Sequence, residues 1–195
     1  YCFHMFAFKK KYFLIIETIK DIDLRTIKKH NKFIIIYRNQ GKKVNIVDLL
    51  NFRKKCKLKS IKFFVANNIN LSVLLKSDGI YLSAYNKSYK SLNLKSNKYS
   101  IIGSAHNSKE IYTKKKQGCS QILMSRLFLV DYKNTQDYMG LNKFNNHTIN
   151  NSRILVPLGG IKLRNINKLK IVNSDSFAIL SEIKKKPANI ISRLF

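Results

Sequence analysis

Tyr-Ser-Ile-Ile-Gly-Ser-Ala-His-Asn, running from Tyr99 to Asn107, is the stretch of sequence that decides the fold. Its apolar part has the length of a short buried strand, which ends abruptly in small and polar residues. Asn107 followed three positions later by Glu110 is typical of a helix N-terminus. The end of the strand and the first free helix N–H groups are therefore expected to face the same place, which suits an anion or a polar substrate.

The same succession of an apolar strand and a polar ending recurs along the chain, at Arg38-Asn39-Gln40, Asn67-Asn68 and Gly159-Gly160. The pattern predicts eight strands, at residues 12–17, 33–38, 61–66, 79–83, 99–104, 121–128, 154–158 and 177–180. Helices or helical turns are predicted at 24–30, 44–57, 70–75, 108–117 and 163–169 and from Pro187 onward, with Gly118 as a C-cap. Residues 84–98 are expected to be irregular, with at most a one-turn helix, and residues 130–140 to form a polar loop.

The predicted strands are short and apolar on both faces, as parallel strands buried beneath helices must be. Eight strands that alternate with helices favour a closed (β/α)8 TIM barrel in one domain over residues 1–195. The active site of such a barrel lies at the carboxyl ends of the strands, and phosphate commonly binds after the seventh and eighth. Gly159-Gly160 and Ser181 occupy those two positions.

The chain is strongly basic, with 38 lysine and arginine residues against 10 acidic ones and a formal net charge of +28. The lysines are spread over every segment together with Asn and Ile, which all have A/T-rich codons. Runs such as Lys114-Lys115-Lys116 are therefore interpreted as solvated faces. We expect weak nucleic-acid binding without sequence preference, and a general attraction for anionic ligands.

Two further features narrow the class of protein. No apolar run reaches the ~20 residues of a membrane span, and the apolar start lacks the charged leader and cleavage site of a signal peptide. A cytoplasmic protein that does not bind membranes is the expectation. Cys2, Cys56 and Cys119 are widely spaced and odd in number, so reduced thiols are expected rather than a disulfide or a metal site.

A resemblance to a known family rests on an ordered set of motifs. The set comprises Ile-Ile-Gly-Ser-Ala-His-Asn-Ser-Lys-Glu from Ile101, then Phe128, Lys133 and Gly140, then Pro157-Leu158-Gly159-Gly160-Ile161 with Asn165, and finally Phe-Ala-Ile-Leu-Ser-Glu-Ile from Phe177. In order and spacing the set resembles the thiamine-phosphate synthases, whose superfamily also contains thiazole tautomerases. The resemblance extends from about residue 33 onward.

The resemblance implies a transferase of thiamine biosynthesis. Its substrates would be hydroxymethylpyrimidine diphosphate and a thiazole phosphate, and its products thiamine phosphate and pyrophosphate. The diphosphate leaves first in this family, and the thiazole nitrogen then captures the pyrimidine methyl cation. The implied partners are therefore two small phosphorylated molecules, the implied cofactor is Mg2+, and a homo-oligomer is possible.

The resemblance also assigns roles to individual residues. Arg38 matches the diphosphate-binding arginine at the end of the second strand, where a guanidinium fork suits phosphate oxygens, and Lys133 matches the lysine of the loop after the sixth strand. Ser104 matches the serine after the fifth strand, and His106 is a candidate proton carrier whose alternative role is to orient the loop before its helix. The substrate-binding positions are Gln40, which replaces a family lysine, Asn67 for the pyrimidine, and the phosphate cradle of Gly160, Leu180 and Ser181.

The departures from the family concern the metal. Asn68 and Asn86 stand where the family has the aspartates that hold Mg2+, and neutral amide oxygens bind this ion less strongly than carboxylates do. Ile36, Val130 and Tyr132 also replace polar family residues, so the phosphate-cradle half is better preserved than the diphosphate and metal half.

Three functions stay open at this point. The first is a divergent thiamine-phosphate synthase, and the second is a metal-independent, tautomerase-like enzyme that acts on a thiazole phosphate or a related precursor. The third is a non-enzymatic basic binding protein on a barrel scaffold.

Overall fold

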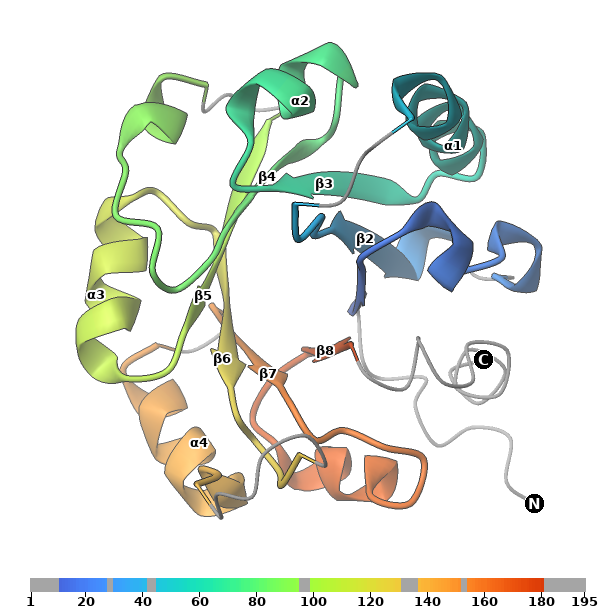
Figure 1. Cartoon of the computed structure of the whole chain (residues 1–195). Coiled ribbons are helices and arrows are strands. Elements are labelled where there is room, and N and C mark those ends of the chain that lie inside the picture. The colour runs from blue at the N-terminus through green and yellow to red at the C-terminus, as the bar shows by residue number, and fades with distance from the viewer. Residues whose placement is uncertain are drawn as a thin grey trace.

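The computed structural model describes residues 11–27, 30–41, 45–94, 99–130, 137–151 and 154–180. In this part of the chain eight parallel strands close into a barrel in sequence order, with β8 paired to β1 (Figure 1). The (β/α)8 prediction is thereby confirmed. The strands are β1 (Lys11–Ile16), β2 (Phe33–Tyr37), β3 (Lys62–Ala66), β4 (Gly79–Leu82), β5 (Ser100–Ala105), β6 (Gln121–Ser125), β7 (Leu155–Leu158) and β8 (Ser176–Ile179).

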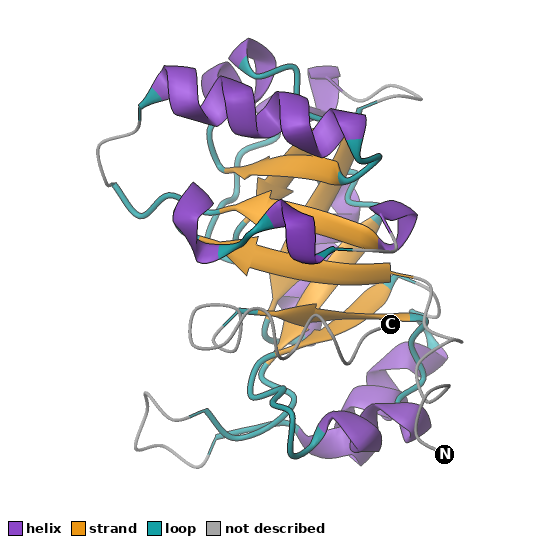
Figure 2. Ribbon diagram, turned by 90° about the vertical axis from the view of Figure 1, so that its right-hand side faces the viewer, coloured by secondary structure: helices purple, strands orange, loops and turns teal. Residues whose placement is uncertain are grey.

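Helices cover the outside of the strand ring, as the view of Figure 1 and the side view of Figure 2 both show. Within the described residues the α-helices are α1 (Ile46–Leu58), α2 (Ile69–Leu74), α3 (Ser108–Lys116) and α4 (Gly140–Ile149). Short 3-10 helices make up other connections: η1 (Ile19–Asp21), η2 (Leu24–Thr26), η3 (His30–Lys32), η4 (Lys90–Leu94) and η5 (Ile166–Ile171).

Side chains alternate between two apolar layers, because successive residues of a strand point to opposite faces. One layer fills the barrel interior, and the other packs beneath the helices. The interior layer consists of Phe13, Ile15, Ile34, Ile36, Phe64, Tyr81, Ile102, Leu123, Val156 and Ala178. A side chain that continues this alternation beyond the end of a strand therefore points into the mouth of the barrel.

The stretch around β5 folds as its sequence predicts. The Asn107 side chain accepts a hydrogen bond from the Glu110 N–H at 3.0 Å and so caps α3. At the other end of the helix Gly118 has φ +75°, and the N–H groups of Gly118 and Cys119 donate to the carbonyls of Lys115 and Lys114. These two hydrogen bonds form a Schellman motif, which requires the left-handed conformation that glycine adopts easily.

Several predicted elements differ from those observed. The helices predicted at 24–30 and 163–169 are only the 3-10 turns η2 and η5, and the strand predicted at 121–128 already ends at Ser125. The helix predicted from Pro187 lies outside the described residues. Within 84–98 the expected one-turn helix is present as η4.

Helix α4 was not predicted, because its sequence is rich in asparagine, a poor helix former. Tertiary contacts compensate for this low propensity. Asn145 accepts the Asn173 N–H at 2.8 Å and donates to the Ile171 carbonyl at 2.9 Å, and Thr148 accepts from the Asn173 side chain at 2.8 Å. The helix is therefore tied to the segment before β8, which lies far away in the sequence.

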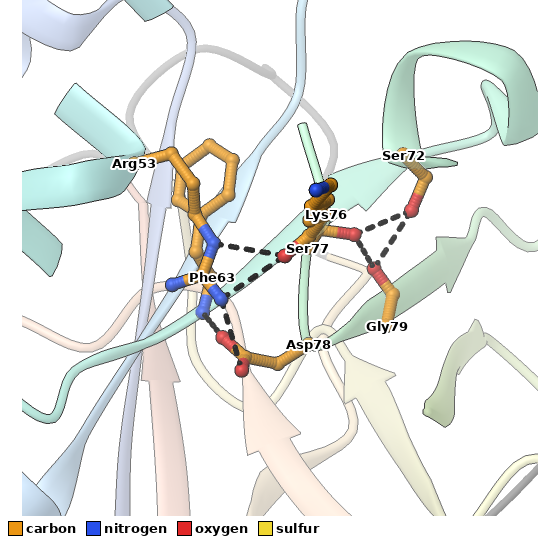
Figure 3. A network of polar contacts seen from close by, with 7 residues as sticks. All are labelled: Arg53, Phe63, Ser72, Lys76, Ser77, Asp78 and Gly79. Carbon is orange, nitrogen blue, oxygen red and sulfur yellow. Dashed lines mark hydrogen bonds and ion pairs between the residues drawn. The ribbon is translucent and has the colours of Figure 1, made fainter. Parts of the chain in front are cut away.

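A polar network stabilises the amino-terminal ends of β3 and β4 (Figure 3). Arg53, which is only 8% exposed, donates from Nη2 to Asp78 Oδ1 and to the Lys76 carbonyl, both at 3.1 Å. Asp78 Oδ2 in turn accepts the Phe63 N–H at 2.7 Å. Since this network lies at the barrel end opposite the strand C-termini, we interpret it as structural.

Candidate active site

The carboxyl ends of β2 and β3 border a polar pocket of about 480 Å3. The position of Arg38 at this pocket is fixed by the backbone. The Arg38 N–H donates to the Ile16 carbonyl at 2.8 Å and so prolongs the β1–β2 pairing by one residue. Four predicted site residues thus come together from two strand ends. The pocket is lined by Arg38, Asn39, Gln40, Ala66, Asn67, Asn68 and Tyr85.

Ser104 continues the inward alternation of β5 and is only 6% exposed. It forms a hydrogen bond with Tyr81, whose ring belongs to the barrel interior. Burial raises the pKa of Tyr81, while the Ser104 bond and the charge of Arg38 act in the opposite direction. The predicted residues Arg38 and Ser104 therefore share a buried neighbour, Tyr81, that the sequence pattern did not single out.

Asn67 has a constrained geometry at the end of β3. Its φ is +56°, a left-handed conformation that asparagine tolerates better than most residues, and its N–H donates to the Tyr81 carbonyl at 2.8 Å. The side-chain oxygen Oδ1 accepts from the N–H and hydroxyl of Ser83 at 3.0 and 3.1 Å and from Asn86 Nδ2 at 3.0 Å. Asn67 thus joins the end of β3 to the loop after β4.

The two positions expected to hold Mg2+ are engaged otherwise. Asn68 Oδ1 accepts the Leu71 N–H at 2.9 Å and caps α2. Asn86 turns an N–H donor toward Asn67, and its Oδ1 accepts the Ser88 N–H at 2.9 Å. Across the residues that the structure describes, no group of three or more His, Cys, Asp or Glu side chains could hold a metal. The donor set present does not fit Mg2+, which prefers oxygen ligands and carboxylates above all.

A buried lysine supports the Asn86 loop from behind. Lys114 on α3 is fully buried, and its Nζ donates to the Asn86 carbonyl at 2.6 Å and to Gln117 Oε1 at 2.8 Å. Gln117 Nε2 donates to the Asn86 and Ser88 carbonyls at 3.0 and 2.8 Å. Burial lowers the pKa of Lys114. The interpretation of the 114–116 run as a solvated face is therefore wrong for its first residue, while Lys115 and Lys116 are exposed.

His106 stands at the turn between β5 and α3, with its side chain 57% exposed. Its Nδ1 lies 3.0 Å from Glu110 Oε2, and the same carboxylate oxygen accepts the His106 backbone N–H at 2.7 Å. Burial raises the pKa of Glu110, but the hydrogen bonds and charge of His106, together with a hydrogen bond from Asn107, leave that pKa lowered. The contact gives His106 the carboxylate partner of a proton carrier, and it also fits the loop-orienting role.

The Gly159-Gly160 turn packs tightly against the segment that follows β6. Gly159 and Gly160 have φ of +96° and +67°, and a Cβ on Gly160 would overlap the carbonyl oxygens of Phe128 and Leu129. Asn165 closes the turn, because its Nδ2 donates to the Gly160 carbonyl at 2.7 Å. Leu180 packs against the interior layer, as its place in the alternation requires.

Two predicted site residues, Lys133 and Ser181, lie outside the described residues, so their roles stay predictions. Two residues with evident parts in the site were missed, Tyr81 and Lys114. The inward alternation of β4 could have indicated Tyr81. Lys114 lies three residues after the buried Ile111, and this helical spacing was the available signal for its burial.

The fold is a (β/α)8 barrel that brings polar side chains from neighbouring strand ends together around a pocket. The family model described as thiamine monophosphate synthase matches residues 20–183, and the chain belongs to that family. Membership supports a role in thiamine biosynthesis.

Similarity to individual proteins agrees with this assignment. A thiamine-phosphate synthase of Prochlorococcus marinus subsp. pastoris is 27% identical over 146 residues, which cover 74% of this chain and 42% of that protein. A second, from Prochlorococcus marinus strain SARG, is 24% identical over 129 residues, covering 66% of this chain and 37% of that protein. The chain thus spans about two fifths of the length of these curated relatives.

Among solved structures, a thiamine phosphate pyrophosphorylase from Pyrococcus furiosus superposes with a TM-score of 0.73 at 17% identity. The match covers 96% of this chain and 94% of that one, and it shows a shared fold. None of the described helices combines the length and the apolar character that crossing a membrane requires.

Proposed function

We propose that this chain is a transferase that condenses hydroxymethylpyrimidine diphosphate with a thiazole phosphate. The carbon–oxygen bond between the pyrimidine methylene and the diphosphate breaks, and its electron pair leaves with pyrophosphate. The lone pair of the thiazole nitrogen then forms the new carbon–nitrogen bond. Atoms and electrons balance without an oxidant or a reductant.

The observation that carries the proposal is the pocket in which Arg38 and Asn67 meet at neighbouring strand ends. A guanidinium presents a planar fork of donors, which suits the oxygens of a departing diphosphate. Because three donors already engage Oδ1 of Asn67, this side chain offers a substrate its Nδ2 hydrogens. Such a donor suits the ring nitrogens of a pyrimidine.

The charge on the leaving diphosphate must be offset by the protein's own cations in this proposal, since the asparagines do not fit Mg2+. A fixed cation in a partly dry site stabilises developing negative charge by several kcal/mol. We therefore expect slow turnover with little dependence on Mg2+. Arg38 binds and orients the diphosphate, and Ser104 and Tyr81 form the polar floor beside it.

A tautomerase-like reaction on a thiazole phosphate is the second candidate. The His106–Glu110 contact at 3.0 Å favours it, because a carboxylate that contacts Nδ1 fixes the imidazole for proton transfer at Nε2. This reaction would need no metal.

The test is to incubate the full chain with both condensation substrates, in Mg2+ or in EDTA, and to quantify thiamine phosphate and pyrophosphate. Arg38→Met is expected to lower kcat/KM by about a hundredfold, the usual loss when one charge-stabilising donor is removed. Arg25→Met is the charge-matched control, since Arg25 is an exposed surface residue paired with Asp23.

Absence of thiamine phosphate in both conditions would rule out the condensation, and isomerisation of a thiazole phosphate would then support the second candidate. Full turnover that EDTA abolishes would show that groups other than Asn68 and Asn86 hold a metal.

A further inference from the structure

The outer surface of α3 carries an aromatic ring among lysines. Lys109, Tyr112 and Lys116 stand at positions i, i+3 and i+7 of the helix, which places them on one face, and all three are exposed. Tyr112 is 60% exposed, and the Lys116 ammonium lies 4.7 Å from the centre of its ring. This distance is that of a cation–π contact. The ring is thus held by one cation and still faces solvent over much of its surface.

The loop that precedes η4 adds a second tyrosine to this surface. Tyr89 is 48% exposed and lies within electrostatic reach of Lys116. The buried Gln117 of α3 donates from Nε2 to the Ser88 carbonyl at 2.8 Å, so the backbone next to Tyr89 is fixed on the helix. The two tyrosines therefore belong to one preformed surface. This surface, called the α3 face below, consists of the exposed residues Lys87, Tyr89, Lys109, Tyr112 and Lys116.

The side of the barrel that carries the α3 face is poor in carboxylates. Glu110 is the only acidic residue in the sequence between positions 79 and 130, and its carboxylate is bonded to His106 at the start of the helix. Asp21 and Asp23 lie in the connection after β1, which is four strands from β5 in the closed ring and hence on the opposite side of the barrel (Figure 1). The lysines of the α3 face therefore form a positive surface that suits a polyanion.

We propose that the α3 face binds single-stranded nucleic acid without sequence preference, with unpaired bases stacked on Tyr89 and Tyr112 and phosphates in contact with the lysines. Every base has an aromatic face, so stacking on a tyrosine ring tolerates any sequence, and lysines that contact phosphates release counterions. The proposal gives one surface to the sequence-independent binding that the composition leads us to expect. It does not depend on the proposed condensation.

The chemistry of the α3 face favours a single strand over two other polyanions. The bases of a duplex are stacked on one another, whereas those of a single strand are free to stack on aromatic side chains. An anionic membrane would favour a helix that inserts aliphatic side chains between the lipids. The one aliphatic residue of α3, Ile111, is buried in the protein.

The test measures binding of the full chain to a fluorescently labelled oligothymidine by anisotropy at low ionic strength. The double variant Tyr89→Ala, Tyr112→Ala is expected to weaken binding at least about tenfold, because stacking on two rings is lost. Tyr138→Ala is the matched control, since Tyr138 is 52% exposed and stands before α4, away from the α3 face. This control should bind within about twofold of the unmodified chain.

A pair of lysine variants separates the α3 face from the general positive charge. Lys109→Gln with Lys116→Gln should lower the slope of log K against log salt by about 1.4, from about 0.7 for each phosphate contact of a single strand. Lys168→Gln with Lys170→Gln removes the same charge from exposed positions of η5 and should leave that slope unchanged.

Four results would overturn the proposal. The tyrosine double variant could bind oligothymidine as tightly as the unmodified chain, or the two lysine pairs could weaken binding equally, which would show attraction by net charge alone. The matched duplex with oligoadenosine could bind as tightly as the single strand. Vesicles of phosphatidylglycerol could bind with the same dependence on Tyr89 and Tyr112, which would identify the α3 face as a membrane contact.

Discussion

Asn86 Nδ2 donates a hydrogen bond to Asn67 Oδ1 across 3.0 Å, and this contact joins the two strand ends at which the family's metal site is expected. The geometry requires an amide at position 86. A carboxylate there would set a second acceptor against Oδ1, and turning the Asn67 amide over would set Nδ2 against the Ser83 N–H. The surroundings of position 86 therefore suit an asparagine, whose amide donates to Asn67, better than an aspartate.

Asn86→Asp should therefore lower the free energy of unfolding by about 1–3 kcal/mol in the absence of metal, measured by urea denaturation. Asn68→Asp is the matched control. Aspartate caps a helix as well as asparagine does, so that change should stay within about 0.5 kcal/mol.

The double variant Asn68→Asp, Asn86→Asp brings two carboxylates to this edge of the barrel. We expect Mg2+ to stabilise the double variant and to leave the unmodified chain unchanged, with both followed by urea denaturation with and without the ion. Equal Mg2+ stabilisation of both proteins would show that the two introduced carboxylates do not create the metal site.

Gly160 is expected to tolerate no side chain. Its φ of +67° costs a substituted residue about 1–2 kcal/mol, and the overlap with the Phe128 and Leu129 carbonyls adds to that cost. Gly140 has a similar φ of +74°, and a Cβ on it would meet no atom within 4 Å, so Gly140→Ala isolates the conformational cost. Gly160→Ala should consequently destabilise the protein more than Gly140→Ala does, and equal losses would contradict the overlap.

The buried thiol of Cys56 is expected to make the free energy of unfolding depend on pH in the alkaline range. Burial raises its pKa from 9.0 to about 12, so above pH 9 the unfolded chain loses this proton while the folded chain keeps it. Stability contributed by Cys56 is full below pH 9 and is lost between pH 9 and 12, with a slope of about 1.4 kcal/mol per pH unit.

The measurement compares urea denaturation of the unmodified chain and Cys56→Ala across this pH range. The variant lacks the titrating thiol, so its stability should fall less steeply, although the cavity costs it a constant amount at every pH. Parallel pH profiles of the two proteins would disprove the assignment to Cys56.

The parts of the fold that the sequence predicted are those with a local cause. Strand ends such as Arg38 and Asn67 are marked by a change from apolar to polar residues, and alternation along a strand indicates which side chains reach the barrel mouth. The helix start at Asn107 is likewise a short-range signal. These features need no knowledge of distant segments.

The parts that were missed depend on distant partners. Helix α4 relies on bonds from Asn145 and Thr148 to the segment at 171–173, which compensate for poor helix formers. Lys114 can be buried because the Asn86 carbonyl, 28 residues away in the sequence, accepts a hydrogen bond from its ammonium group. Composition alone placed Lys114 in a solvated run, since it cannot distinguish a buried lysine from its exposed neighbours Lys115 and Lys116.

Lys114→Met tests whether the lysine positions the Asn86 loop. The variant keeps much of the side-chain volume but removes both donors, which leaves Gln117 Oε1 without the Lys114 bond and the Asn86 carbonyl with Gln117 alone. We expect a loss of about 1–3 kcal/mol in unfolding free energy near neutral pH. Lys115→Met is the control at the adjacent exposed position and should be nearly neutral.

The pH dependence of the Lys114→Met effect has a definite sign. Burial lowers the pKa of Lys114 below 10.5, so between the folded-state value and 10.5 the unfolded chain binds more protons than the folded chain. The stability of the unmodified chain therefore gains a rising contribution with pH in this window, and its advantage over Lys114→Met should grow there. An advantage that shrinks toward pH 10.5 would mean that the folded protein holds the ammonium more strongly than water does. Lys114 would then be a bound cation of the Asn86 loop and not a buried donor that tolerates the loss of its charge.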